Sequence, residues 1–273
     1  MTAIEVKVFS DAESLGSALA QEIIDGIDLA TANGKDYVLG CPGGRSPRTT
    51  YLALAALVRQ RATDLSHVVI AMMDDYVVSD GKTMRSVDPS SHFSVMAFAQ
   101  NEIVAPLNSA APKGCGISAD RLWLPDPSDP NAYERKLEDA GGIDLFILAS
   151  GDSDGHVAFN PPGSDSSSRT RIIELAESTR RDNLNTFPEF KSLDEVPLYG
   201  ISVGLATIRE FSHRTVLLAP GPSKAQAVMR IKSATELDPA WPATILAECQ
   251  KPSLYTDQST PSIGYSEKPS TTT

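Results

Sequence analysis

The chain has few cysteines, and none of them is placed to bind a metal. Cys41, Cys115 and Cys249 are widely spaced and odd in number, a pattern typical of reduced thiols in a cytosolic protein. No group of Cys and His residues has the spacing of zinc ligands. We expect neither a metal site nor a cofactor.

Positive charge is also scarce. The 24 Lys and Arg residues are outnumbered by 35 Asp and Glu residues, and the basic residues form no run. The net charge of −11 argues against binding of nucleic acid through its phosphates, so we expect no such partner. No secretion signal and no apolar run of membrane-spanning length is found, which predicts a cytoplasmic protein without a membrane partner.

Strand and helix patterns alternate along the 273 residues. This alternation predicts one α/β domain over residues 1–256, with a doubly wound, mainly parallel, modified Rossmann-like sheet. The expected strands cover residues 4–9, 37–40, 67–73, 143–148, 171–175, 198–203, 215–219 and 253–256. The expected helices cover residues 10–32, 47–60, 93–103, 131–140, 205–211, 224–231 and 243–250. The Ser/Thr/Pro-rich residues 257–273 predict a flexible tail.

The segment Asp154-Gly155-His156 follows the apolar run of residues 143–148. In open α/β sheets, ligands bind at the carboxyl ends of the strands. Histidine both takes and gives a proton near neutral pH, and Asp154 is close enough in sequence to fix the tautomer of His156. The same residues also fit a plain glycine turn with exposed side chains.

A glycine-rich loop, residues 40–47, lies between another expected strand and a helix. Glycines let a backbone approach a ligand, and the start of a helix offers free N–H groups to an anion. With the cation of Arg45, the loop predicts an anion site made by Gly43, Gly44, Arg45 and Ser46. Neither a Walker motif nor a dinucleotide fingerprint is present, and an ordinary turn is the alternative.

Two further strand ends carry charge. Asp74 and Asp75 are adjacent like charges, and loss of water raises the pKa of a carboxyl group in such a place, which suits a general base. Because neighbouring residues of an extended segment point in opposite directions, only one of the two faces a pocket. Lys224 begins a helix, where a cation is unfavourable unless an anion binds there. A solvated acidic turn and a surface lysine are the alternatives.

These segments together resemble the glucosamine-6-phosphate deaminase/isomerase family, within the superfamily that includes 6-phosphogluconolactonases. The resemblance extends from about Val38 to Thr260. It rests on the order and spacing of seven segments, LGCPGGRSPRTTY (39–51), MDDYV (73–77), SHFSVM (91–96), DGHVAFN (154–160), SRTRI (168–172), VGLATI (203–208) and GPSKA (221–225).

The resemblance implies a fold of the sugar-phosphate isomerase type, a small sugar phosphate as partner and no metal; a homo-oligomer is left open. It implies that Asp74 moves a proton between C1 and C2 of the open-chain sugar. Asp154 and His156 match the pair that assists ring opening. Gly44, Arg45, Ser46 and Lys224 match phosphate-loop positions, and Arg171 is included among the expected substrate-binding residues.

Two positions depart from the deaminase pattern. Pro161 stands where deaminases carry a Glu of the ring-opening group, and Asn185 aligns with a phosphate-binding Arg. Three functions follow as hypotheses: an isomerase or deaminase, favoured by the segments 74–77 and 168–171; a sugar-lactone hydrolase, favoured by Arg45 and the missing Glu; and a non-catalytic sugar-phosphate-binding protein.

Overall fold

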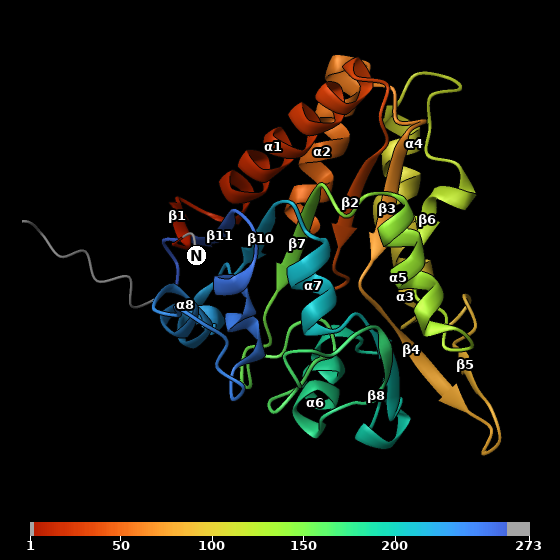
Figure 1. Cartoon of the computed structure of the whole chain (residues 1–273). Helices are drawn as coiled ribbons and strands as arrows, with labels where there is room; N and C mark the ends of the chain where they lie inside the picture. Colours follow the sequence, from red (N-terminus) through yellow and green to blue (C-terminus); the bar gives the residue numbers. More distant parts are fainter. Residues whose placement is uncertain (1–2, 261–273) are drawn as a thin grey trace, which may run out of the picture.

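The computed structural model describes residues 3–260, except for the side chain of Asn185. Residues 261–273 of the predicted tail lie outside the described residues. Seven strands form a parallel sheet in the order β1-β11-β10-β7-β2-β3-β6 (Figure 1). Their bounds are β1 Glu5–Phe9, β2 Tyr37–Cys41, β3 Val68–Met72, β6 Leu122–Trp123, β7 Leu145–Ala149, β10 Thr215–Leu218 and β11 Pro252–Asp257. This arrangement confirms the predicted mainly parallel α/β fold.

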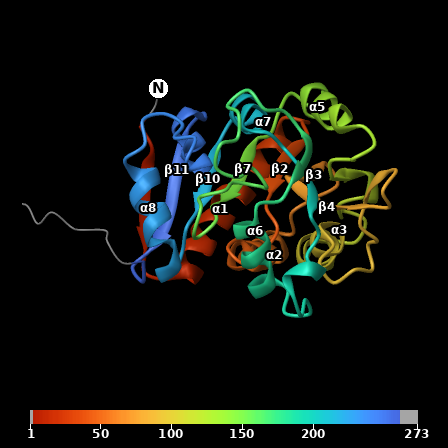
Figure 2. The same ribbon diagram turned by 90° about the horizontal axis from the view of Figure 1, so that it is seen from below.

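Helices cover both faces of the parallel sheet (Figure 2). One face packs on α1 Ala12–Ala32, α2 Arg48–Arg61, α3 Val95–Phe98, the π-helical turn η1 Ala99–Val104 and α4 Ala105–Ala110. The other face packs on α5 Pro130–Asp139, α7 Leu205–Phe211, α8 Ala225–Lys232 and the 3₁₀ helix η5 Pro242–Glu248. Short 3₁₀ turns complete the chain at η2 Ala119–Arg121, η3 Leu193–Glu195 and η4 Pro222–Lys224.

The central strands are buried on both faces, which explains their continuous apolar sequence. Along β7, Leu145 and Ile147 belong to the core under α1 and α2, whereas Phe146 and Leu148 belong to the core under α7 and α8. The period of two along a strand thus divides the apolar residues between two cores. The polar loops lie at the edge of the sheet that is formed by the carboxyl ends of the parallel strands.

A second, antiparallel sheet lies beyond that edge and was not expected from the sequence. It has the order β5-β4-β9-β8, with bounds β4 Asp74–Ser79, β5 Met84–Ser86, β8 Arg171–Glu174 and β9 Tyr199–Ser202. Only Met73 separates β3 from β4, so the predicted acidic loop at residues 74–77 is the beginning of a strand. Helix α6, Glu177–Thr186, lies beside this sheet and was also not predicted (Figure 1).

Gly204 allows the loop before β8 to pack on the start of α7. The backbone N–H of Ala206 donates to the Ser168 carbonyl oxygen at 3.0 Å. A Cβ atom on Gly204 would lie 2.0 Å from that same oxygen. Because a backbone atom cannot rotate away, we expect Gly204→Ala to lower the free energy of unfolding by about 3 kcal/mol, at the upper end of overpacking costs.

Urea unfolding measures this change, and Gly43→Ala is the matched control. A Cβ atom on Gly43 meets nothing within 4 Å, and its backbone does not adopt a positive φ. Equal stability of the two variants would contradict the packing described at Gly204.

Candidate functional site

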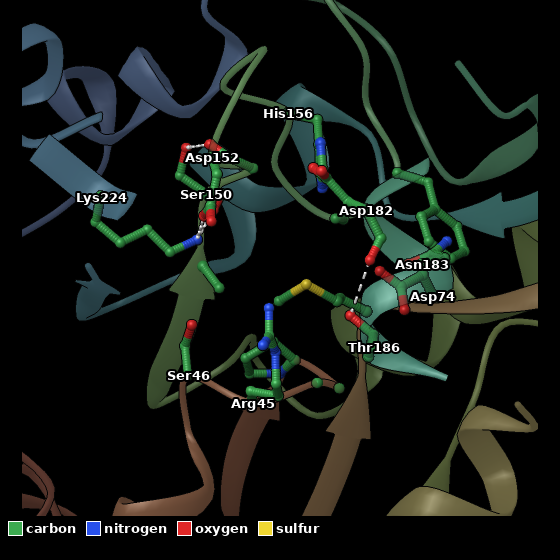
Figure 3. A pocket seen from close by; sticks show the side chains of 18 of the residues that line it. Arg45, Ser46, Asp74, Ser150, Asp152, His156, Asp182, Asn183, Thr186 and Lys224 are labelled. Atoms are coloured by element: carbon green, nitrogen blue, oxygen red, sulfur yellow. Dashed lines mark hydrogen bonds and ion pairs between the residues drawn. The ribbon is translucent and has the colours of Figure 1, made fainter. Parts of the chain in front are cut away.

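A cavity of about 430 Å³ opens at the carboxyl ends of the parallel strands. Its volume is within the range of small-molecule sites. Its walls come from the loops after β2, β7 and β10, from β4 and from α6. Figure 3 shows Asp74, His156, Arg45 and Lys224 around this one space, although they are far apart in the sequence.

Asp74 places a free carboxylate in the cavity wall. Only 7% of the residue is exposed, and within residues 3–260 no hydrogen-bond donor reaches its side chain. Burial, together with the charge of Asp75, raises the pKa of Asp74 to about 7. The charged carboxylate has lost its hydration, and no hydrogen bond stabilises it instead. It is therefore a stronger base than an exposed aspartate.

Asp75 points away from the cavity, as the alternation along an extended segment requires. Its Oδ1 accepts the backbone N–H groups of Tyr76 at 2.8 Å and Val95 at 3.2 Å. Burial raises the pKa of Asp75 to about 6, and these two hydrogen bonds oppose the rise. Asp75 therefore holds the start of α3 against β4. Its negative charge also raises the pKa of Asp74.

Asp154 and His156 form a coupled pair. Asp154 Oδ1 accepts the backbone N–H of His156 at 3.0 Å and lies 2.8 Å from its Nδ1. Burial would raise the pKa of Asp154, but the hydrogen bond and charge of His156, with the Ser178 hydroxyl, hold it well below its usual range. Asp154 therefore orients the imidazole, and among the described residues none hydrogen-bonds to Nε2. Gly155 sits at φ +68 against Trp241, where a Cβ atom would clash.

The loop of residues 43–46 offers unused donors. None of its four backbone N–H groups donates to another group within the described part of the chain. Helix α2 begins just after this loop, so its positive end faces the same corner. Arg45 and Ser46 line the cavity there (Figure 3). This corner has the donors and the charge of an anion site.

Lys224 completes the corner, but it already has an anionic partner. Its Nζ donates to the Ser150 carbonyl oxygen and is ion-paired with Asp152 (Figure 3). Burial would raise the pKa of Asp152, but Lys224, Ser223 and Arg45 together lower it. The unfavourable position of a cation at the start of a helix is thus offset within the protein by Asp152.

Most of the predicted site residues lie around the cavity. Its lining includes Gly43, Gly44, Arg45, Ser46, Asp74, His156 and Lys224. Asp154 lies behind His156 rather than in the lining. Arg171 does not line the cavity, because its guanidinium donates to Asn160 Oδ1 at 3.0 Å. Asn160 in turn donates to the carbonyl oxygens of Val157 and Val203, so Arg171 helps to hold the loop that carries His156.

Sequence reasoning missed the polar residues that α6 contributes, namely Asp182, Asn183 and Thr186. It also missed the role of Asp152, although that residue lies within the segment singled out around His156. Residues 3–260 contain no helix long and apolar enough to span a membrane. Over the same residues, no group of three or more His, Cys, Asp or Glu side chains could hold a metal ion.

Comparison with known proteins identifies the family. Residues 10–255 match the family model described as glucosamine-6-phosphate isomerases/6-phosphogluconolactonase. A glucosamine-6-phosphate deaminase of Shouchella clausii is 31% identical over 98% of this chain and 99% of its own length. That of Streptomyces coelicolor is 36% identical over 82% of this chain and 79% of its own.

Solved structures agree with this result. A monomeric glucosamine-6-phosphate deaminase superposes with a TM-score of 0.78 at 25% identity, covering 94% of this chain and 98% of its own. A 6-phosphogluconolactonase of Trypanosoma cruzi has a TM-score of 0.67 at 15% identity over 94% and 95% of the two chains, which shows the shared fold. The chain therefore belongs to the family of glucosamine-6-phosphate isomerases and 6-phosphogluconolactonases.

Proposed function

We propose that the protein is an aldose–ketose isomerase of the deaminase type, acting on an amino-sugar phosphate. The observation that carries this proposal is the Asp74 carboxylate, which is buried, has no donor and faces the cavity. A buried carboxylate of raised pKa suits the removal of a proton from carbon. The related deaminases point to the same chemistry.

The neighbouring groups suit the other steps of this reaction. His156, oriented by Asp154, passes a proton between the anomeric hydroxyl and the ring oxygen as the ring opens. Asp74 then takes the proton from C2 while the carbonyl oxygen at C1 gains a proton from the ammonium group of the substrate, which forms an enolamine, and Asp74 returns the C2 proton to C1. Water adds to the resulting imine at C2 and ammonia leaves, which gives the ketose. The corner around Arg45 and Lys224 holds the phosphate during these steps.

A lactonase is the second candidate. Arg45 and Pro161 favour it, and His156 would then activate water rather than open a ring.

Under either function we propose that the protein acts in the cytoplasm, which is consistent with its three free cysteines. Its partner is a small sugar phosphate.

The test is a set of separate product assays. Purified protein is incubated with 2-amino-2-deoxyaldose 6-phosphates and with sugar-acid lactone phosphates. Ammonia, ketose and acid are each measured. Release of ammonia and ketose in equal amounts supports the proposal. Acid release from a lactone, with no ketose from any amino sugar, would assign the second function.

Replacement of Asp74 by Asn should remove the base while keeping the shape of the side chain. We expect Asp74→Asn to lower kcat by roughly three orders of magnitude, within the range of general-base contributions, with little change in binding of the substrate. Single-turnover rates and equilibrium binding measure the two separately. A variant that keeps its rate would show that Asp74 is not the base.

The raised pKa of Asp74 sets the pH dependence. Below about pH 7 Asp74 becomes protonated, so kcat/KM should fall by about tenfold for each further pH unit. Asp75→Asn removes the neighbouring charge but keeps an acceptor for the N–H groups of Tyr76 and Val95. The fall of kcat/KM on the acidic side of the pH profile should then occur at lower pH. The unmodified protein and the variant are assayed with the same substrate, so titration of the substrate affects both pH profiles equally. If the two pH profiles of kcat/KM coincide, Asp74 is not the base.

Two substitutions near Arg45 and Lys224 should change phosphate binding in opposite directions. Arg45→Ala removes a cation and should weaken binding of inorganic phosphate by about tenfold. Asp152→Asn removes the internal competitor for Lys224 and should tighten phosphate binding by about fivefold. Competitive inhibition by phosphate measures both changes, with the exposed Asp80→Asn as the control. If both variants weaken binding equally, the phosphate does not lie between Arg45 and Lys224.

A further inference from the structure

One face of α6 is turned toward the catalytic pair. At its start, the Ser178 hydroxyl donates to Asp154 Oδ2, and Thr179 Oγ1 lies 3.4 Å from His156 Nδ1. Residues three and four apart share a helix face, so Asp182 follows Ser178 on the same side. Asp182 lines the cavity, as Asn183 and Thr186 do after it. The helix thus approaches His156 from the cavity side.

The Asp182 carboxylate has no partner of its own. Within residues 3–260 it makes no hydrogen bond, and no cation lies within ion-pair distance. Figure 3 shows Asp182 and His156 pointing toward one another. Burial raises the pKa of Asp182; the charges of Asp152 and Asp154 add to this rise, whereas His156 and Lys224 oppose it. Of these four residues, His156 acts on Asp182 most strongly.

A second carboxylate beside the pair of Asp154 and His156 would stabilise the positive charge that ring opening places on His156. When His156 takes the proton of the anomeric hydroxyl, its ring becomes positively charged until a proton passes to the ring oxygen. In that interval the C1–O5 bond breaks and the C1–O1 double bond forms. Asp154 stabilises the charge from the Nδ1 side only. Position 161, where the resemblance places a Glu, is Pro161 and offers no charge.

We propose that Asp182 supplies this second carboxylate, as a positioning residue that acts through His156 from the cavity side. It comes from α6 rather than from the loop that carries the pair. The inference rests on the proposed function, because it assigns Asp182 to the ring-opening step of that reaction. It makes Asp182 a substitute, from another part of the chain, for the carboxylate lost at Pro161.

The test separates ring opening from proton transfer. One substrate is a 2-amino-2-deoxyaldose 6-phosphate, which is mostly cyclic through its C1–O5 bond. The other is its 4,5-dideoxy analogue, which has no hydroxyl that can close a ring. Loss of the C2 proton is followed by NMR for both. The variants are Asp182→Asn, which removes the charge, and Asp182→Glu, which keeps it. The matched control is Glu177→Gln, an exposed carboxylate of the same helix that pairs with Arg181.

We expect Asp182→Asn to lower kcat for the cyclic substrate by about tenfold, a part of what a general acid–base group contributes, with KM nearly unchanged. The 4,5-dideoxy analogue should lose its C2 proton at the rate seen with the unmodified protein. Asp182→Glu should recover most of the loss, and Glu177→Gln should behave as the unmodified protein. These results would support the role of Asp182 even if the Asn variant were less stable, because a folding defect would affect both substrates.

Two outcomes would overturn the inference alone. Equal losses on both substrates would mean that Asp182 supports binding or folding, and no loss on either would mean that it does not act through His156. Failure of the proposed function is a different result, since the unmodified protein would then remove the C2 proton of neither substrate. In that case the inference fails together with the proposed function.

Discussion

The parallel pairing of the central strands is the constraint on which the site depends. The register of β2 with β7 and of β7 with β10 brings the carboxyl ends of these strands to one edge. The loops that follow them carry Arg45, His156 and Lys224, so residues nearly 180 positions apart along the chain surround one cavity. Because β4 continues from β3 after a single residue, the same edge also receives Asp74.

The distribution of charge around the cavity follows from this arrangement. The protein is strongly acidic, and the cavity itself holds Asp74, Asp152 and Asp182. Each of the three has a different environment. Asp152 is neutralised by Lys224, whereas Asp74 and Asp182 have no ion-pair partner among the described residues. Under the proposed function, the unpaired carboxylates lie where a proton is moved and the cations lie where the phosphate binds.

Much of this arrangement could be predicted from the sequence, because the central strands and most helices have clear apolar patterns. Two elements had no such pattern. Helix α6 contains mostly polar residues, and its packing depends on Thr179 and on contacts with the loop around His156, so no apolar period marks it. Strand β4 begins with two aspartates, which are typical of turns, and pairing with β9 and β5 makes that segment a strand.

The placement of Arg171 could not be inferred from the sequence either. A basic residue in a segment shared with sugar-phosphate enzymes is reasonably expected at the substrate. In the structure the buried amide of Asn160 needs a donor, and the Arg171 guanidinium supplies it. Resemblance alone indicated which segments matter, but hydrogen-bonding requirements decided which side chains were free for a ligand.

The central claim is that the protein removes a proton from carbon, and the product itself records this step. An amino-sugar 6-phosphate is converted in D₂O, and the C1 position of the ketose is examined by NMR. If Asp74 moves the proton while it exchanges with solvent, the ketose carries deuterium at one of the two C1 positions. A product labelled equally at both C1 positions would contradict transfer by a single carboxylate fixed on one side of the substrate.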